Sequence, residues 1–353
     1  MKKIFFGLLI LVFASSCATT DSKIKYYSDF NKTFELNGTR VGPVDYFLEP
    51  RQMILVDSLI VVSDFETEKL FHLVTRNNYK LKNSFGSKGK GPGEFLGPNM
   101  SKRMYNNQLV VTDKSITKIY NLDSMISVPY YESNTKIDFP DELIIPYNLF
   151  YLNVTTIIGF NGPAIIGSTT SGKFRAFNFN PGTGKINYTV DDLFFKQREA
   201  KRQLHLGQIF YAINDYNYTR ELFVSALRYF KQIDLYNNDL SLLASLQPEN
   251  QIEPIFSKNS NSFLDDKTVF HYIDVFTTPK YIYAIYCGKD FVTATAGIGN
   301  KIHVFSWEGE ALYEIDLNIG LSNIIITDDD KTLIGLNWLD RQPFVIYDLS
   351  NLI

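Results

Sequence analysis

The chain has 353 residues, of which 45% are hydrophobic and 21% are charged, and this balance excludes an intrinsically disordered protein. Aromatic residues make up 15% of the chain, with 28 Phe and 22 Tyr, and such residues favour half-buried strands. The formal net charge of −3 argues against nucleic acid as a partner, because binding to phosphates needs a clustered basic surface.

The first residues form an export signal. Lys2 and Lys3 precede the apolar run 4–13, and small residues then lead to Cys17. The run is too short to cross a bilayer, which needs about 20 apolar residues, so we interpret it as a secretion signal. We expect residues 1–16 to be a signal peptide, 17–30 a lipid-anchored tether, and 31–353 the folded domain.

The apolar run that ends in Cys17 resembles the lipobox of bacterial lipoproteins, and its Ser-Ser-Cys ending is similar to lipoproteins of the Bacteroidetes. The resemblance implies cleavage before Cys17, acylation of that residue, and attachment to the outer membrane through the lipid. Ala14 stands where that family usually has Leu. No acidic run follows Cys17, which favours the periplasmic side over the cell surface. The alternative is an ordinary signal peptide that is cut nearby.

Short strand-like runs separated by turns begin near residue 52 and continue to the end of the chain. The glycine-rich stretch Ser84–Pro98 separates two similar sets of runs, and Val61–Asp64 in the first set corresponds to Val110–Asp113 in the second, 49 residues later. A recurring period of this length is typical of a repeat fold. The second strands of the six units are centred on Val62, Val111, Ile166, Val224, Ala284 and Ile334.

The sixth unit lacks a fourth strand, whereas Lys32–Leu36 is a strand-like run without a unit of its own. An unpaired sheet edge invites aggregation, so we expect Thr33–Leu36 to pair beside Pro343–Tyr347 and to close the ring. Six four-stranded antiparallel sheets joined in this way make an all-β, six-bladed β-propeller.

Two features carry a further resemblance. The stretch Gly86–Phe95 with Pro98, together with the two Val-x-Asp strands, resembles NHL-type propeller repeats in the first two units, but units three to five lack this match. The chain as a whole is similar to the TolB-like six-bladed propeller lipoproteins of the Bacteroidetes. That family is known mainly as a fold, so the resemblance implies architecture and location rather than an activity.

Long connections are expected on one face of the ring, where each blade joins the next and where second strands join third strands. They are 86–98, 191–206, 247–267 and 287–300. Because long loops in a compact fold are usually functional or disordered, we expect the binding site on this face, over the mouth of the central channel.

Six side chains are candidate ligand contacts: Arg51, Arg103, Lys196, Arg198, Arg202 and His271. Residues 191–206 are predicted to form a helix whose basic side chains either attract an anionic group or form a solvated face. The two arginines near the first two inner strands either hold a carboxylate bidentately or pair with a neighbouring blade. The histidine on the fifth inner strand is the one placed to face the channel.

We expect no structural disulfide, because Cys287 is the only cysteine besides Cys17, and no cofactor, since no metal-ligand spacing, nucleophile elbow or phosphate loop is present. We therefore interpret the chain as a binding protein for a partner protein, peptide or glycan rather than an enzyme. The alternative is a hydrolase of the lactonase type, which needs Asp, Glu, Asn or His side chains converging on one metal ion in the channel.

Overall fold

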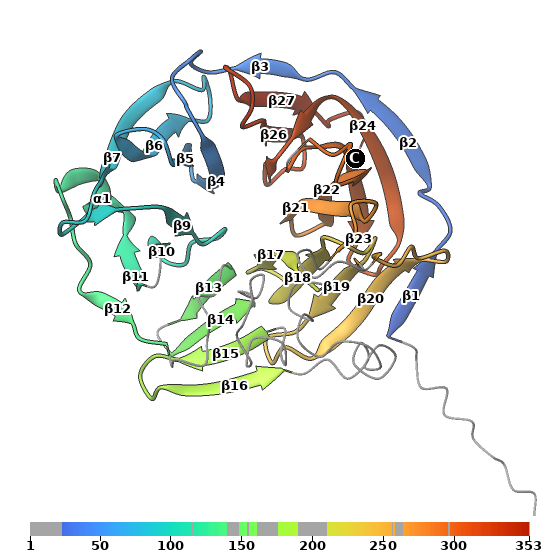
Figure 1. Ribbon diagram of the computed structural model, residues 1–353, viewed down its shortest axis with the longest axis horizontal. Helices are drawn as coiled ribbons and strands as arrows, with labels where there is room; N and C mark the ends of the chain where they lie inside the picture. The colour runs from blue at the N-terminus through green and yellow to red at the C-terminus, as the bar shows by residue number, and fades with distance from the viewer. Residues whose placement is uncertain are drawn as a thin grey trace, which may run out of the picture.

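The computed structural model describes residues 23–113, 116–139, 148–153, 155–160, 176–189, 210–255, 257, 264–295 and 297–352. Within this part of the chain, six sheets are arranged in a ring (Figure 1), so the predicted all-β, six-bladed propeller is confirmed. Each blade has its first strand at the centre of the ring and its last strand at the rim.

The first three blades follow one another along the chain. Blade one contains β4 (Pro50–Val56), β5 (Leu59–Asp64), β6 (Lys69–Thr75), β7 (Leu81–Lys88) and β8 (Glu94–Phe95). Blade two contains β9 (Pro98–Met100), β10 (Gln108–Asp113), β11 (Ile116–Asn121) and β12 (Thr135–Ile137), with helix α1 (Leu122–Ser127) before the last strand. Blade three contains β13 (Asn148–Asn153), β14 (Thr156–Phe160), β15 (Ala176–Asn180) and β16 (Lys185–Thr189).

The other three blades each include a strand from the N-terminal segment. Blade four contains β17 (Ala212–Asn217), β18 (Leu222–Leu227), β19 (Ile233–Tyr236), β20 (Leu242–Pro248) and β1 (Ile24–Tyr27). Blade five contains β21 (Val269–Thr277), β22 (Tyr281–Asp290), β23 (Gly299–Ser306), β24 (Ala311–Leu321) and β2 (Lys32–Leu36). Blade six contains β25 (Asn323–Ile326), β26 (Thr332–Leu336), β27 (Phe344–Asp348) and β3 (Thr39–Val41).

The hydrophobic core lies in the seams between blades. Side chains alternate between the two faces of a strand, and in β5 both faces are covered. Ile60 and Val62 are fully buried in the cluster shared with blades five and six, whereas Val61 belongs to the cluster shared with blade two. This arrangement explains why the second strands of the units read as continuous apolar runs.

The N-terminal segment 24–41, here called the belt, runs along the rim of three consecutive blades (Figure 1). β1 and β2 add parallel to the outer strands β20 and β24, and β3 adds antiparallel to β27. Blades four and five therefore have five strands rather than the four predicted. The belt also takes in residues 24–30, which the sequence assigned to the tether.

The expected pairing of Thr33–Leu36 with the last blade is wrong. Lys32–Leu36 lies beside blade five, where Phe34 is paired with Ile315, and the strand beside β27 is Thr39–Val41. The sequence pattern favoured the longer and more apolar run, whereas the position of a segment along the rim decides which blade it reaches.

Candidate functional site

The two faces of the ring carry different connections. Because neighbouring strands of a blade are antiparallel, connections from second to third strands and from blade to blade emerge on one face, here called the loop face. This face carries the connections 42–49, 89–97, 249–268, 291–298 and 337–343, of which the third and fourth are described in part. The other face has mostly short turns such as 57–58 and 278–280, although it also has the longer connection 122–134.

Seven exposed apolar side chains lie in connections of the loop face that belong to blades four, five, six and one. We call this set of residues the apolar crest, and it consists of Val44, Leu48, Ile252, Ile255, Phe291, Val292 and Leu339. Val292 is 76% exposed, Leu48 62% and Ile252 61%, which are high values for large apolar side chains. Contiguous exposed apolar patches are a general feature of interaction sites.

Hydrogen bonds join the connections that carry the crest. The amide of Asp45 donates to the carbonyl of Arg341 (2.8 Å), and the amide of Phe291 donates to the carbonyl of Asp266 (3.1 Å). The connections that carry the crest are therefore hydrogen-bonded to each other in pairs.

Arg51 lies at the start of β4, the inner strand of blade one, three residues after the crest residue Leu48. It forms an ion pair with Glu49, and its guanidinium lies 4.5 Å from the ring centre of Trp338 in blade six. A guanidinium over an aromatic face is held by electrostatic attraction to the ring. Of the two interpretations of Arg51, the structure shows contact with a neighbouring blade, and its side chain is 39% exposed.

The glycine-rich stretch between blades one and two lines two cavities, of about 190 Å³ and about 430 Å³. The smaller lies between β7 and the segment Met125–Tyr131, and the larger between the glycines and β11. Two carboxylates along the larger cavity have local partners: Lys118 Nζ lies 2.6 Å from a carboxylate oxygen of Glu132, and the amide of Gly91 donates to Glu94 (2.7 Å).

The aspartates of the two Val-x-Asp strands have the same structural role. Asp64 accepts hydrogen bonds from the amides of Leu48 (2.8 Å) and Glu49 (2.9 Å). Asp113 accepts from the amides of Leu96 and Gly97, both at 2.9 Å. Each carboxylate thus fixes the turn that leads into the inner strand of its own blade, so the NHL-like motif is structural here.

A pair of basic residues crosses the centre of the ring. Arg103, in the connection after β9 of blade two, donates to both carboxylate oxygens of Asp215 in blade four (2.7 and 2.5 Å) and to the carbonyl of Thr277 in blade five (2.7 Å). Its neighbour Lys102 binds Asp274 of blade five. Figure 1 shows this connection reaching toward the centre of the ring.

This arrangement, here called the channel brace, is largely buried. Asp215 is fully buried and Asp274 is 3% exposed, and both carboxylates are bound by cations. Burial raises the pKa of Asp274, although the Lys102 ammonium acts in the opposite direction. Asp274 also accepts from the side-chain amide of Asn323 in blade six (2.7 Å). The sequence predicts Arg103 before the inner strand, close to the channel mouth, whereas it lies after that strand and binds residues of blades four and five.

His271 is buried against blade four and is 2% exposed. Its amide donates to the carbonyl of Arg228 (2.7 Å), and its ring centre lies 5.8 Å from that of Tyr286. Burial, reinforced by the charge of Lys231, lowers the pKa of His271 to about 3. The imidazole is therefore neutral at ordinary pH.

Four predicted residues lie outside the described part of the chain: Cys17, Lys196, Arg198 and Arg202. The predicted helix 191–206 also lies outside it. Among the residues that the structure describes, no three His, Cys, Asp or Glu side chains form a group suited to a metal ion. In the same part of the chain, no helix is long and apolar enough to cross a bilayer.

A family profile described as "TolB-like 6-blade propeller-like" matches residues 29–329. The chain belongs to this family. No curated protein sequence is significantly similar to this TolB-like propeller.

Solved structures show the same fold at low sequence identity. A protein from Bacteroides fragilis, described as exported, is 12% identical with a TM-score of 0.56, and the match covers 89% of this chain and 97% of that one. A member of the DUF4221 family from Bacteroides vulgatus is 11% identical with a TM-score of 0.51, covering 90% and 98%. At this identity, the TolB-like propeller shares with them only its fold.

Sequence reasoning missed Lys102, Asp215, Asp274 and the crest. Lys102 and Arg103 form an adjacent basic pair, but their partners lie 172 and 112 residues away. No local pattern signals a contact across the ring. The crest residues are scattered over separate connections, and only the ring brings these connections to one face.

Proposed function

We propose that this TolB-like propeller is a lipid-anchored binding protein outside the cytoplasm, and that its apolar crest binds a partner protein. The observation that carries the proposal is the concentration of exposed apolar side chains on the loop face. Large apolar residues surrounded by polar ones favour a protein surface over a glycan or a hydrophilic peptide. The lipobox-like ending at Cys17 and the exported relative from Bacteroides fragilis support the location.

The channel brace favours binding on the face over chemistry at the centre. A lactonase-type site needs carboxylates that are free to converge on one ion. Here Asp215 and Asp274 instead neutralise Arg103 and Lys102. The brace also fixes the inner strands relative to each other, which gives the loop face a rigid base. Rigid support lowers the entropy cost of binding.

The test compares a crest variant with a matched control. In the variant, Leu48→Glu and Leu339→Glu place charges on two crest residues that are 62% and 52% exposed. The control is the single change Leu243→Glu, which introduces the same charged residue at a 46% exposed position on β20 outside the crest. Proteins captured from envelope extracts of the source organism are quantified, and the leading candidate is purified for direct binding.

We expect wild type and the control to bind the purified partner equally, and the crest variant to bind it at least tenfold more weakly. Equal binding by all three chains, or capture of no partner that depends on the crest, would overturn the proposal. In cells of the source organism, Cys17→Ala is expected to move the protein from the membrane fraction to the soluble fraction. If it stays with the membrane, the anchor is wrong while the crest proposal stands.

A further inference from the structure

The outer edge of blade one is open along most of β7. The short strand β8 pairs with this edge only at Ser87 and Lys88, in parallel orientation. In the part of the chain that the structure describes, no strand lies outside residues 81–86. By contrast, the belt adds β1 and β2 in parallel to the outer strands of blades four and five. Parallel addition of an extended segment is therefore how this ring completes the outer edges of blades four and five.

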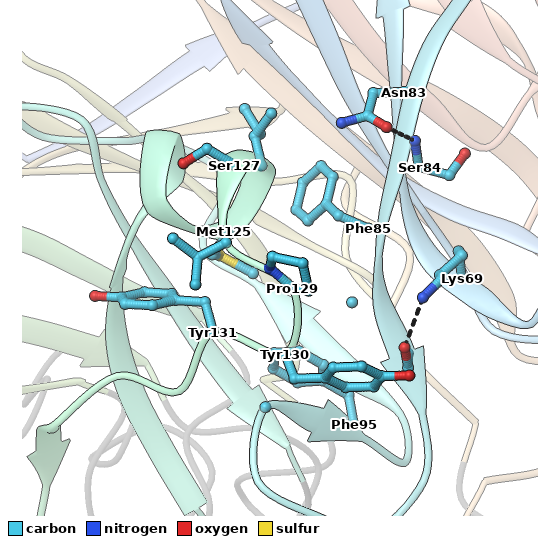
Figure 2. A pocket seen from close by; sticks show the side chains of 15 residues that line it. Lys69, Asn83, Ser84, Phe85, Phe95, Met125, Ser127, Pro129, Tyr130 and Tyr131 are labelled. Atoms are coloured by element: carbon cyan, nitrogen blue, oxygen red, sulfur yellow. Dashed lines mark hydrogen bonds between the residues drawn. The ribbon is translucent and has the colours of Figure 1, made fainter.

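The backbone of β7 presents a hydrogen-bond donor at this open edge. The amide of Ser84 donates to the side-chain oxygen of the adjacent Asn83 (2.8 Å) rather than to another strand (Figure 2). Gly86 has a φ of +68°, which interrupts the regular alternation of the strand, so Ser84 is the amide on which the open edge depends. Asn83 thus covers an amide that an incoming strand would use.

A groove runs beside this edge. Figure 2 shows β7 on one side and the segment from α1 to Tyr131 on the other. Its floor is apolar, because Phe85, Phe95 and Met125 line it and are each no more than 5% exposed. The cavity of about 190 Å³ is smaller than the roughly 300–1,000 Å³ of small-molecule sites, and it suits one large side chain.

One cation lies in the wall of the groove. Lys69 Nζ donates to Ser87 Oγ (2.7 Å) and lies 5.6 Å from the ring centre of Tyr130. Both contacts are neutral, and among the described residues no carboxylate forms an ion pair with Lys69. A carboxylate that entered the groove would therefore meet an unpaired positive charge.

We propose that this groove binds an extended segment of a partner polypeptide, which adds to blade one as a strand parallel to β7. The main chain of the segment pairs with the edge at Ser84, where it takes the place of the Asn83 side chain. One of its aromatic or large aliphatic side chains fills the cavity over Phe85, and an adjacent acidic residue pairs with Lys69. Strand addition of this kind takes its affinity from the main chain and its specificity from side-chain pockets. The site lies at the rim and is separate from the apolar crest.

The test uses random decapeptides displayed on phage and selected on the chain without its signal segment. Selected peptides are synthesised with a fluorescent label, and their affinity is measured by anisotropy. In Ser84→Pro the edge donor is lost, and proline is tolerated on an edge strand where the amide faces outward. Ser84→Ala is the matched control, because it loses the same hydroxyl contacts with His72 and Tyr46 but keeps the amide.

We expect peptides that carry an aromatic residue next to an acidic one. Their affinity should fall at least tenfold in Ser84→Pro and less than twofold in Ser84→Ala. Hydrogen exchange on the wild-type chain gives a second readout, also usable if the proline variant does not fold. A selected peptide should protect the amide of Ser84 and leave those of β12 unchanged.

Three results would overturn the proposal. They are a selection that yields no binder, peptides that bind Ser84→Pro as well as wild type, and peptides that protect residues other than those of β7. A fourth result would also overturn it, namely that a second copy of this chain occupies the groove. If the chain dimerises in light scattering and Ser84→Pro abolishes the dimer, the groove serves self-association rather than a partner peptide.

Discussion

Blades four, five and six differ from blades one, two and three in what covers their outer edges. The belt pairs with β20, β24 and β27 through its main chain, and it contributes Tyr27, which is 8% exposed, to the core between blades four and five. In the other half, polar side chains such as Lys82 and Asn83 occupy the edge of β7, and α1 lies beside it (Figure 1).

The comparison shows two ways to protect a sheet edge. Main-chain pairing satisfies the edge permanently, whereas polar side chains only discourage the addition of another strand. We infer that the belted half provides stability and that the open half leaves an edge available for a partner. The channel brace connects the halves, because Arg103 belongs to blade two and its ligands belong to blades four and five.

Removal of the belt is the strongest way to break this comparison. A chain that begins at residue 42 loses the packing of Tyr27 against Phe305, with ring centres 5.6 Å apart, and all pairing along three outer strands. We expect a loss of about 5 kcal/mol or more in the free energy of unfolding, together with aggregation through the exposed edges. Urea denaturation and light scattering measure both effects. A shortened chain as stable as the original would show that the two halves do not differ.

Loss of the brace is expected to have the next largest effect. Asp215→Ala leaves Arg103, and the amide and hydroxyl of Thr277, without their buried acceptor. We expect a cost of about 3–5 kcal/mol, as for other buried ion pairs that lose one partner. Arg341→Ala, which breaks the exposed pair with Asp45, is the control and should leave the urea midpoint unchanged. Equal effects of the two substitutions would mean that the brace does not hold the halves together.

The smallest expected effect is a sensitivity of the belted half to acid. Burial lowers the pKa of His271 to about 3 and that of His303 to about 4, and the belt residue Phe30 lies 4.4 Å from the His303 ring. In the unfolded chain both histidines take up protons below about pH 6.5, whereas in the folded chain they do so only near pH 4 and 3. Stability is therefore complete above pH 6.5 and falls as the pH drops toward 4.

Each histidine contributes up to about 1.4 kcal/mol per pH unit over this interval. His271→Phe removes one of them together with its unpaired Nδ1, so the free energy of unfolding should depend less steeply on pH. Urea denaturation at several values between pH 7.5 and 4.5 measures the slope. An unchanged slope in the variant would show that His271 takes no part in acid sensitivity.

The amino-acid sequence by itself determined the repeat, the loop face and most of the strand pattern, although the second strand of blade three is Thr156–Phe160, before the predicted centre at Ile166. Alternating apolar residues report strands locally, and the spacing of Asp64 and Asp113 reports two equivalent turns, because each aspartate binds amides of its own blade. Chain order then fixes which connections share a face, since antiparallel strands reverse direction at every turn.

Only the tertiary structure decided which segments meet across the ring. Closure of the circle places Thr39–Val41 beside the last blade, sets Arg103 opposite Asp215, and gathers the crest from separate connections. Such contacts join residues more than a hundred positions apart, and no local pattern encodes them. They follow from the geometry of six blades around one axis, which brings blade two face to face with blade five.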